Sequence, residues 1–243
     1  MRKRAYILLA ASALLLVFST VGSTRAALTY YSENYAAEVT VSSIGISLTE
    51  NGKIVSHRDY THSDDKWHEA TGELLQNLLG EGEKLEPGKS YPERIGVTNS
   101  GTIDVYARVV ITKSWMDANG KDTTLSPGLI DLNFRSGGWV VDEKASTAER
   151  TVLYYTKPIA SGKSAPDITD TLRVDNSITS KVTETVTEQD GFKTITTSYD
   201  YDGYSFHVEA EVDAVQTHNA KDAIKSAWGV DVVIDSDGTL RLK

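Results

Sequence analysis

The chain has no cysteine, and this absence limits what can stabilise it. No disulfide can form, although small secreted domains often depend on disulfides. An exported domain without them must bury a sufficient core or assemble with partners, and 243 residues can supply such a core in one large domain or two small ones. A chain without cysteine is also more typical of a bacterial exterior than of an animal one.

Catalytic motifs are missing as well. No serine lies in a Gly-x-Ser-x-Gly pattern, no His-Glu-x-x-His pattern occurs, and there is no cysteine nucleophile. Residues 161–164 (SGKS) resemble the end of a phosphate-binding loop, but they lack the upstream glycine and the strand-to-helix context. The 34 acidic residues leave a catalytic carboxylate pair open, because sequence alone does not place them in space. We predict no enzymatic activity and no cofactor.

Long apolar runs are absent except near the N-terminus. Residues 7–21 are almost continuously apolar, with basic residues 2–4 before them and the small-residue sequence 24–26 (TRA) after them. This arrangement is typical of a signal peptide, and the run is shorter than the roughly 20 residues that span a membrane. We predict a signal peptide over residues 1–26, cleavage between Ala26 and Ala27, and secretion to the extracellular matrix or cell surface. An uncleaved membrane anchor is the alternative.

Basic residues are outnumbered by acidic ones. The chain has 25 Lys and Arg against 34 Asp and Glu, a formal net charge of −9. The first 26 residues hold four of the basic residues and none of the acidic ones, so their removal leaves 21 basic residues and a net charge of −13. This balance argues against nucleic acid and anionic membrane surfaces as partners.

Apolar and polar side chains alternate every two residues through most of the remaining chain, which is typical of β-strands. The clearest stretch is residues 84–112, where Ile95 and Val97 precede the turn sequence 99–101 (NSG). We predict a strand, a tight turn in which Gly101 adopts a positive φ, and a central second strand. Similar patterns predict further strands at residues 38–49, 130–134, 139–141, 150–157, 204–215, 230–234 and 239–242, and Asn51-Gly52 predicts a turn after the first of them.

Two stretches change to the spacing of an α-helix. Residues 67–79 place tryptophan, alanine and leucine side chains on one stripe before Gly80. Residues 219–228 begin at Asn219, a favourable N-cap, and end before Gly229. We predict a short helix in each stretch.

Residues 181–203 differ from the rest of the chain, because they are rich in threonine and polar on both faces. A turn near residues 189–191 predicts a two-stranded ribbon inserted into the domain. With about ten short strands and closely spaced turns, the sequence predicts an all-β fold over residues 38–243. We expect a jelly-roll-type β-sandwich with two short helices and this polar β-ribbon.

Metal binding is an alternative interpretation at two groups of polar residues. The first group comprises His57, His62, His68, Asp59, Asp64 and Asp65. Its spacing matches no ligand template, so a solvated polar loop is the preferred interpretation. The second group is Asp235 and Asp237, where a plain turn is preferred over calcium because the twelve-residue calcium loop is absent.

In their order along the chain, four segments resemble the TasA and camelysin (CalY) family of exported, fibre-forming matrix proteins of Gram-positive biofilms. They are the signal peptide that runs straight into ALTYYSENYAA, residues 39–48, LEPGKSYPERIGVTNSGTIDVYARVVI, and the late strand that leads into AVQTHNAKDAIKSAWG. The resemblance covers most of the chain after the signal peptide. It implies a jelly-roll domain, processing by a dedicated signal peptidase, and extracellular fibres in which the N-terminal strand of one subunit completes the sheet of the next.

The expected donor strand is the segment 27–37 that cleavage would release. Its self-assembly residues are Ala27, Leu28, Thr29, Tyr30, Tyr31, Ser32 and Tyr35. Alternate side chains such as Leu28 and Tyr30 share one face, which suits pockets on a partner while the backbone pairs with an open sheet edge. A disordered tail is the alternative. The expected partners are further copies of the chain in a homopolymer, the signal peptidase, and other matrix or cell-wall components.

Two other functions stay open at this point. Camelysins have also been classed as metallopeptidases, an activity that would use His57, His62 and His68, although the sequence has no recognisable zinc motif. A monomeric adhesion domain would instead use the ribbon at residues 181–203 as its contact surface.

Overall fold

The computed structural model describes residues 43–59, 68–180, 182–189, 192–199, 201 and 203–243. The chain divides into two units, Met1–Val41 and Ser42–Lys243, and every described residue belongs to the second unit. The predicted signal peptide, the cleavage site between Ala26 and Ala27, and the donor segment 27–37 therefore lie outside the described residues.

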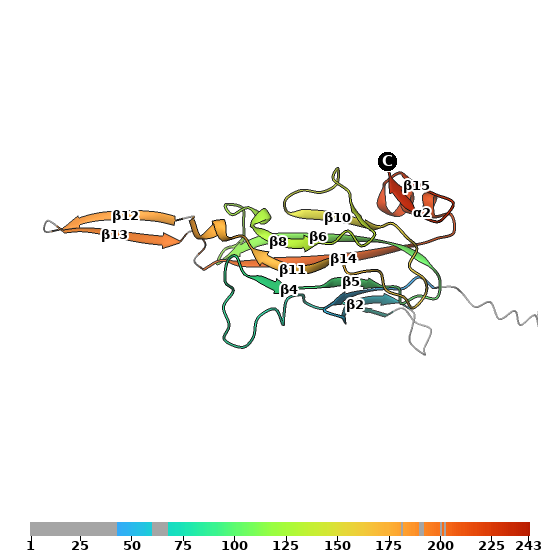
Figure 1. Cartoon of the computed structure of the whole chain (residues 1–243), viewed down its shortest axis with the longest axis horizontal. Coiled ribbons are helices and arrows are strands. Elements are labelled where there is room, and N and C mark those ends of the chain that lie inside the picture. The colour runs from blue at the N-terminus through green and yellow to red at the C-terminus, as the bar shows by residue number, and fades with distance from the viewer. Residues whose placement is uncertain (1–42, 60–67, 181, 190–191, 200, 202) are drawn as a thin grey trace, which may run out of the picture. The chain divides into compact units, whose positions relative to one another are not determined.

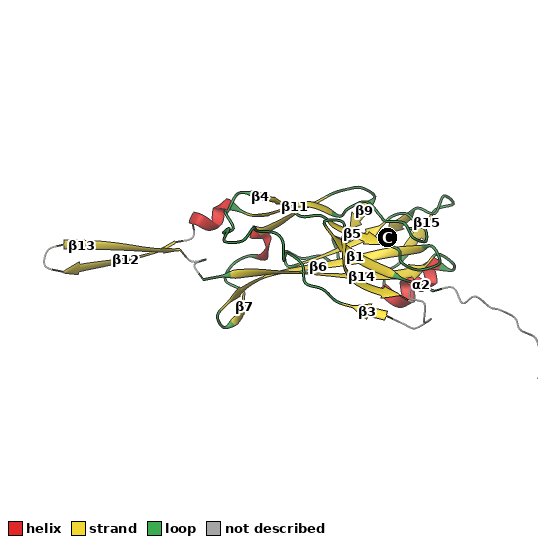
Figure 2. Ribbon diagram, turned by 90° about the horizontal axis from the view of Figure 1, so that it is seen from below, coloured by secondary structure: helices red, strands yellow, loops and turns green. Residues whose placement is uncertain are grey.

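The described strands pair antiparallel throughout (Figures 1 and 2). They are β1 (Ile46–Glu50), β2 (Lys53–Asp59), β3 (His68–Ala70), β4 (Ser90–Pro92), β5 (Ile95–Thr98), β6 (Val105–Asp117), β7 (Gly120–Asp122), β8 (Ile130–Phe134), β9 (Trp139–Val141), β10 (Arg150–Tyr155), β11 (Thr169–Val174), β12 (Val182–Gln189), β13 (Phe192–Tyr199), β14 (Ser205–Gln216), β15 (Val232–Ile234) and β16 (Leu240–Leu242). The helical elements are η1 (Pro127–Leu129), η2 (Asn176–Ser180) and α2 (Ala220–Trp228).

Three sheets build the sandwich. The first has the strand order β3-β2-β1-β5, the second has the order β14-β6-β10-β9 with β7 also beside β6, and the third has the order β4-β11-β8. The strands β12 and β13 pair only with each other among the described strands, and so do β15 and β16. The predicted all-β sandwich is confirmed.

The second sheet is covered on both faces. On its inner face, alternate residues of β6 from Val105 to Ile111 join a buried core with apolar side chains of the first and third sheets. On its outer face, Tyr106 of β6 packs in a second buried cluster with Trp228 of α2 and Leu240 of β16. The strand β6 is therefore internal, as its largely apolar sequence predicted.

The predicted hairpin between residues 95 and 111 is wrong, although both of its strands form. The strand β5 pairs with β1 in the first sheet, whereas β6 pairs with β10 and β14 in the second. Two neighbouring strands in the chain thus lie in different sheets, because each buries its apolar side chains in the shared core from its own side.

The connection between these sheets depends on Asn99, which is fully buried. Its Nδ2 donates to the carbonyl oxygens of Ile103 and Ile159, both at 2.8 Å, and its Oδ1 accepts from the Gly101 N–H at 2.9 Å. The positive φ predicted for Gly101 is not observed. Glycine is needed there for space, because an added Cβ would lie 2.3 Å from the backbone nitrogen of Gly45.

The predicted helix over residues 67–79 is wrong across its described part. Instead, β3 occupies His68–Ala70 and turns follow. Gly72 lies against the backbone of β2, where an added Cβ would be 2.3 Å from the carbonyl oxygen of Val55. Leu75 has a φ of 66°, which no right-handed helix contains. Burial of the leucines against the core therefore outweighed their helical spacing.

Several turns and caps follow the sequence. Asn51 and Gly52, with φ of 49° and 80°, form the two-residue turn between β1 and β2. Gly229 ends α2 in the left-handed conformation, with φ of 74°. At the other end of α2, Asn219 occupies the predicted N-cap position, although its side chain makes no capping hydrogen bond.

The inserted ribbon and the last hairpin are also confirmed. The ribbon pairs from Val182 opposite Tyr199 to Gln189 opposite Phe192, and the described side chains of β12 are exposed. The strands β15 and β16 form the hairpin predicted near the C-terminal end. The early strand predicted at residues 38–49 is observed from Ile46 onward, and residues 38–42 lie outside the described part.

The close approach at Gly101 predicts the effect of a methyl group. Gly101→Ala should lower the free energy of unfolding by about 2 kcal/mol or more, because the new Cβ meets backbone atoms that cannot rotate away. Gly128→Ala is the control, because its Cβ would meet only the Ser126 hydroxyl at 3.3 Å, and it should cost about 0.5 kcal/mol or less. Urea denaturation measures both, and equal stabilities for the two variants would contradict this account of the connection.

Candidate functional site

The long open edge of β14 is the first feature of the candidate site. β14 pairs with β6 over all twelve of its residues, and no described strand pairs with its other side. Outside the two-stranded ribbons, the other edge strands of the described sheets are only three to five residues long. The edge of β5 is also occupied, because its carbonyl groups accept backbone hydrogen bonds from Ala165 and Ile168. β14 therefore offers the longest unpaired sheet edge of the described sandwich.

The side chains of β14 alternate as the sequence predicted. Val208 and Val212 are buried in the inner core, while Glu209 and Glu211 are exposed. Asp213 departs from the simple pattern, because its carboxylate accepts two hydrogen bonds from the half-buried Arg108 guanidinium, at 3.0 and 2.5 Å. The strand thus combines an apolar inner face with a charged outer face.

A groove of about 690 Å³ runs beside this edge. One wall is β14, and the opposite wall consists of β2 and the segment 70–75 that follows β3. Ile46 and Leu48 of β1 are among the apolar residues that line it, together with polar residues such as Glu209 and Glu211 of β14. The groove is therefore partly apolar, and it runs along the backbone edge of β14.

An apolar pocket of about 520 Å³ lies next to the groove and shares Leu75 and Phe206 with it. Among the side chains lining it are Leu75, Leu78, Leu79, Trp115, Tyr204 and Phe206. The rings of Trp115 and Phe206 meet edge to face with centroids 5.9 Å apart, which fixes the orientation of this wall. The pocket has the chemistry to receive an aromatic or long aliphatic side chain.

The structure brings together only some of the residues considered for a metal site. His62, Asp64 and Asp65 lie outside the described residues. Asp59 of β2 is opposite His68 of β3 in the strand register, and His57 is opposite Ala70. Within residues 43–59, 68–180 and the later described ranges, no three His, Asp or Glu side chains lie close enough together to hold a metal ion.

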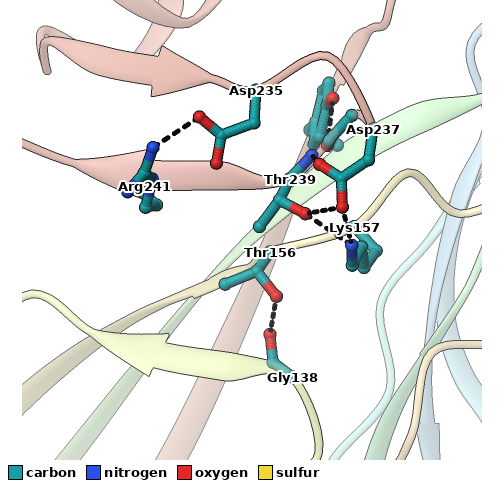
Figure 3. A network of polar contacts seen from close by, with 9 residues as sticks. Gly138, Thr156, Lys157, Asp235, Asp237, Thr239 and Arg241 are labelled. Carbon is teal, nitrogen blue, oxygen red and sulfur yellow. Dashed lines mark hydrogen bonds and ion pairs between the residues drawn. The ribbon is translucent and has the colours of Figure 1, made fainter.

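The two aspartates considered for calcium are engaged by cations of the protein (Figure 3). Asp237 accepts from Lys157 Nζ at 2.9 Å and from the Thr239 hydroxyl at 2.8 Å, and Asp235 accepts from Arg241 at 2.5 Å. Hydrogen bonds from Lys157 and Thr239 hold the pKa of Asp237 far below its usual range. These contacts support the interpretation as a turn that fastens the last hairpin to the segment after β10.

The sequence 161–164 (SGKS) forms a loop between β10 and β11 without a helix after it. The Ser161 hydroxyl donates to the Gly101 carbonyl at 2.7 Å, and the Ser161 N–H points to the Asp104 carboxylate at 3.3 Å. A carboxylate beside this loop disfavours phosphate, and the hydrogen bonds of Ser161 attach the loop to the connection between β5 and β6.

Sequence reasoning missed one buried pair near the groove. Glu50, the last residue of β1, and Glu93, just before β5, are 7% and 1% exposed. A signal was available for Glu93, because it falls in the same alternating phase as Ile95 and Val97, which are core residues. The edge of β14 had no such signal, since it depends on which strands become neighbours.

Comparisons with protein-family models, with characterised proteins and with solved structures found no match to this chain. Among the described helices, none is long and apolar enough to cross a membrane. The resemblance drawn from the sequence therefore stays a prediction.

The contacts of Asp237 predict that calcium does not change the thermal stability of the protein. Adding millimolar calcium or a chelator should leave the thermal unfolding midpoint unchanged, because the carboxylates of the last turn already accept from Lys157, Thr239 and Arg241. Scanning calorimetry of the wild type and of Asp237→Asn measures this. A calcium-dependent rise of the midpoint in the wild type that Asp237→Asn removes would contradict the assignment of a plain turn.

Proposed function

We propose that this protein is a secreted structural protein that polymerises into extracellular matrix fibres, and that the N-terminal segment 27–37 of one copy lies along β14 of the next. The observation that carries the proposal is the twelve-residue outer edge of β14, which pairs with no described strand and lies beside a groove lined in part by apolar residues. A chain that enters such a place gains main-chain hydrogen bonds from the edge and side-chain contacts from the groove.

The lengths of donor and acceptor agree. Eleven residues in an extended conformation span about 36 Å, and the twelve residues of β14 span about 40 Å, at ~3.3 Å per residue. One donor segment therefore covers nearly the whole edge. The three-residue edges of β3, β4 and β9 would pair with only a fraction of it.

The side chains of the donor also suit the acceptor. Leu28 and Tyr30 alternate with Thr29 and Tyr31, so one face of the segment can enter the groove while the other faces water. A tyrosine ring would occupy the apolar pocket between Leu75 and Phe206, and its hydroxyl would reach toward solvent.

The charged side chains on β14 limit which chain segments can pair with its edge. Exposed charged side chains on an edge strand discourage unplanned pairing between sheets. Glu209 and Glu211 have this effect on β14, so a partner must bring a segment with little negative charge. The donor segment 27–37 has a single acidic residue, Glu33.

The contact is head to tail, because the donor and the acceptor are different surfaces. Contacts of this kind produce open filaments unless their rotation closes a ring. In the precursor the donor is joined to the predicted signal peptide, so cleavage between Ala26 and Ala27 would start assembly. The signal peptidase and other matrix or cell-wall components are the further partners of this proposal.

Removal of the donor should abolish polymerisation. A protein that starts at Ala27 should form filaments visible by electron microscopy, whereas one that starts at Ala36 should stay folded and monomeric. A bulky extension before Ala27 should have the same effect, because it prevents entry into the groove.

The control for folding is the circular dichroism spectrum, which should be the same for all three forms. Filaments of the protein that starts at Ala36 would remove the donor segment from the mechanism. Strictly monomeric wild-type protein at every concentration and pH would argue against the fibre itself.

Repulsion between acidic subunits should also govern assembly. Filaments should form more readily near pH 4 than at pH 8, and more readily at 0.1 M salt, where charges are screened beyond about 10 Å. Glu209→Gln with Glu211→Gln should lower the salt requirement more than Glu81→Gln with Glu143→Gln, which removes the same charge away from the groove. Light scattering measures the rate, and fastest growth at high pH and low salt would contradict this electrostatic account.

A further inference from the structure

A buried carboxyl pair lies where β1 and β5 meet the turns that follow β3. Glu50 and Glu93 are both more than nine-tenths buried, and Glu50 is opposite Ile95 in the register of β1 and β5, two residues along from Glu93. Oε2 of Glu93 accepts from Asn51 Nδ2 at 3.2 Å, and its Oε1 has no hydrogen-bond partner outside the pair among the described groups. The backbone of Glu93 is fixed, because its N–H donates to the Asp170 carbonyl and its carbonyl accepts from the Thr169 hydroxyl.

The groups around the pair favour a proton over a metal ion. Asn51 presents its Nδ2 donor to Glu93, because its Oδ1 accepts from the Arg94 N–H at 3.1 Å. The Leu75 N–H points to Oε1 of Glu50 at 2.6 Å. The N–H donors around the two carboxyl groups repel a metal ion. A single proton between the two groups, in contrast, removes one buried negative charge. It also gives Oε1 of Glu93 a hydrogen bond.

The hydrogen bond from Leu75 connects the pair to the leucine loop, which we define as residues 72–79. Leu75 has a φ of 66°, a left-handed conformation that is unfavourable for a non-glycine residue. Such a conformation persists only where surrounding contacts hold it. Leu74, Leu75 and Leu78 pack half-buried against the core, and the loop lines both the groove and the apolar pocket.

We propose that Glu50 and Glu93 share one proton and act as a latch that holds the leucine loop closed, and that loss of the proton releases the loop. A second negative charge in the pair must reach water, and the leucine loop is the cover bonded to it through Leu75. Release would expose the leucines and change the shape of both the groove and the pocket. The latch is a property of the fold and does not depend on the proposed fibre.

Four other charged residues are direct neighbours of the pair. Lys53 of β2 is opposite Glu50, Arg94 follows Glu93, the Asp170 carbonyl on β11 accepts from the Glu93 N–H, and Glu73 lies two residues before Leu75 in the leucine loop. The first two and Glu73 are exposed, so water screens their charges. The Asp170 carboxylate accepts from Asn133 and Arg135, and these hydrogen bonds hold the pKa of Asp170 below its usual value. The charge of Glu50 is therefore the one that acts most strongly on Glu93.

The pH range of the latch follows from its surroundings. Burial and the neighbouring Glu50 raise the pKa of Glu93 to about 7, above its usual value of 4.5. In the closed form Glu93 keeps its proton up to about pH 7, whereas in the open form it loses the proton at lower pH. Closure is therefore favoured in acid and weakens as pH rises toward 7. Above that range both forms are ionised and the effect levels off.

Hydrogen exchange of the purified wild-type protein tests the latch. After correction for the intrinsic rate, protection of residues 72–79 should fall about tenfold between pH 6 and pH 8. Glu93→Gln should keep the loop protected at both values, because its amide donates to Glu50 without titrating. Glu81→Gln, which alters an exposed carboxylate outside the pair, should behave as the wild type does.

A second variant and a second measurement keep the proposal testable if Glu93→Gln does not fold. Glu50→Gln still accepts from Leu75 but removes the neighbouring charge, so the midpoint of the change should move to lower pH. The infrared band of a protonated carboxyl should be present in the wild type at pH 6 and lost by pH 8. Protection that does not change with pH, or that changes equally in Glu93→Gln or with an unmoved midpoint in Glu50→Gln, would overturn the proposal, and so would the absence of the infrared band.

Discussion

Burial of β6 on both faces is the constraint on which the rest of the structure depends. Its inner side chains form the core with the first and third sheets, and its outer side chains require a second cover of their own. The helix α2 and the last hairpin supply that cover. Tyr154 and Trp228 meet with ring centroids 5.5 Å apart, and Arg108 lies over the Trp228 ring at 5.6 Å. Because no disulfide is available, these two clusters must provide the stability of the domain.

The same constraint explains why the open edge lies at β14. β6 has partners on both sides, β10 on one and β14 on the other, so neither edge of the sheet is at β6 itself. On the β10 side the sheet ends at β9, which has only three residues. On the other side it ends at β14, which follows β6 over twelve residues and keeps its outer edge unpaired among the described strands. A long central strand thus produces a long edge.

Local patterns in the sequence predicted the strands but not their neighbours. The alternation at Ile95 and Val97 and the turn residues Asn51 and Gly52 act within a few residues, and these predictions are confirmed. The assignment of β5 and β6 to different sheets depends on contacts between distant segments, such as Asn99 with Ile159, which no local pattern contains.

The leucine stretch illustrates how tertiary contacts override local spacing. Its period favours a helix, but the close approach of Gly72 to β2 and the hydrogen bond from Leu75 to Glu50 hold it as turns. The groove is formed by this non-helical path together with β14, so the site could not be predicted from periodicity. The donor segment, in contrast, was proposed from the sequence alone.

The most direct test of the account is a structure of the assembled protein by cryo-electron microscopy. The account predicts continuous density for residues 27–37 of one subunit along the outer edge of β14 in the next, with an aromatic side chain in the pocket between Leu75 and Phe206. A filament in which the edge of β14 is in contact with solvent, or in which subunits meet through the ribbon of β12 and β13 instead, would contradict it.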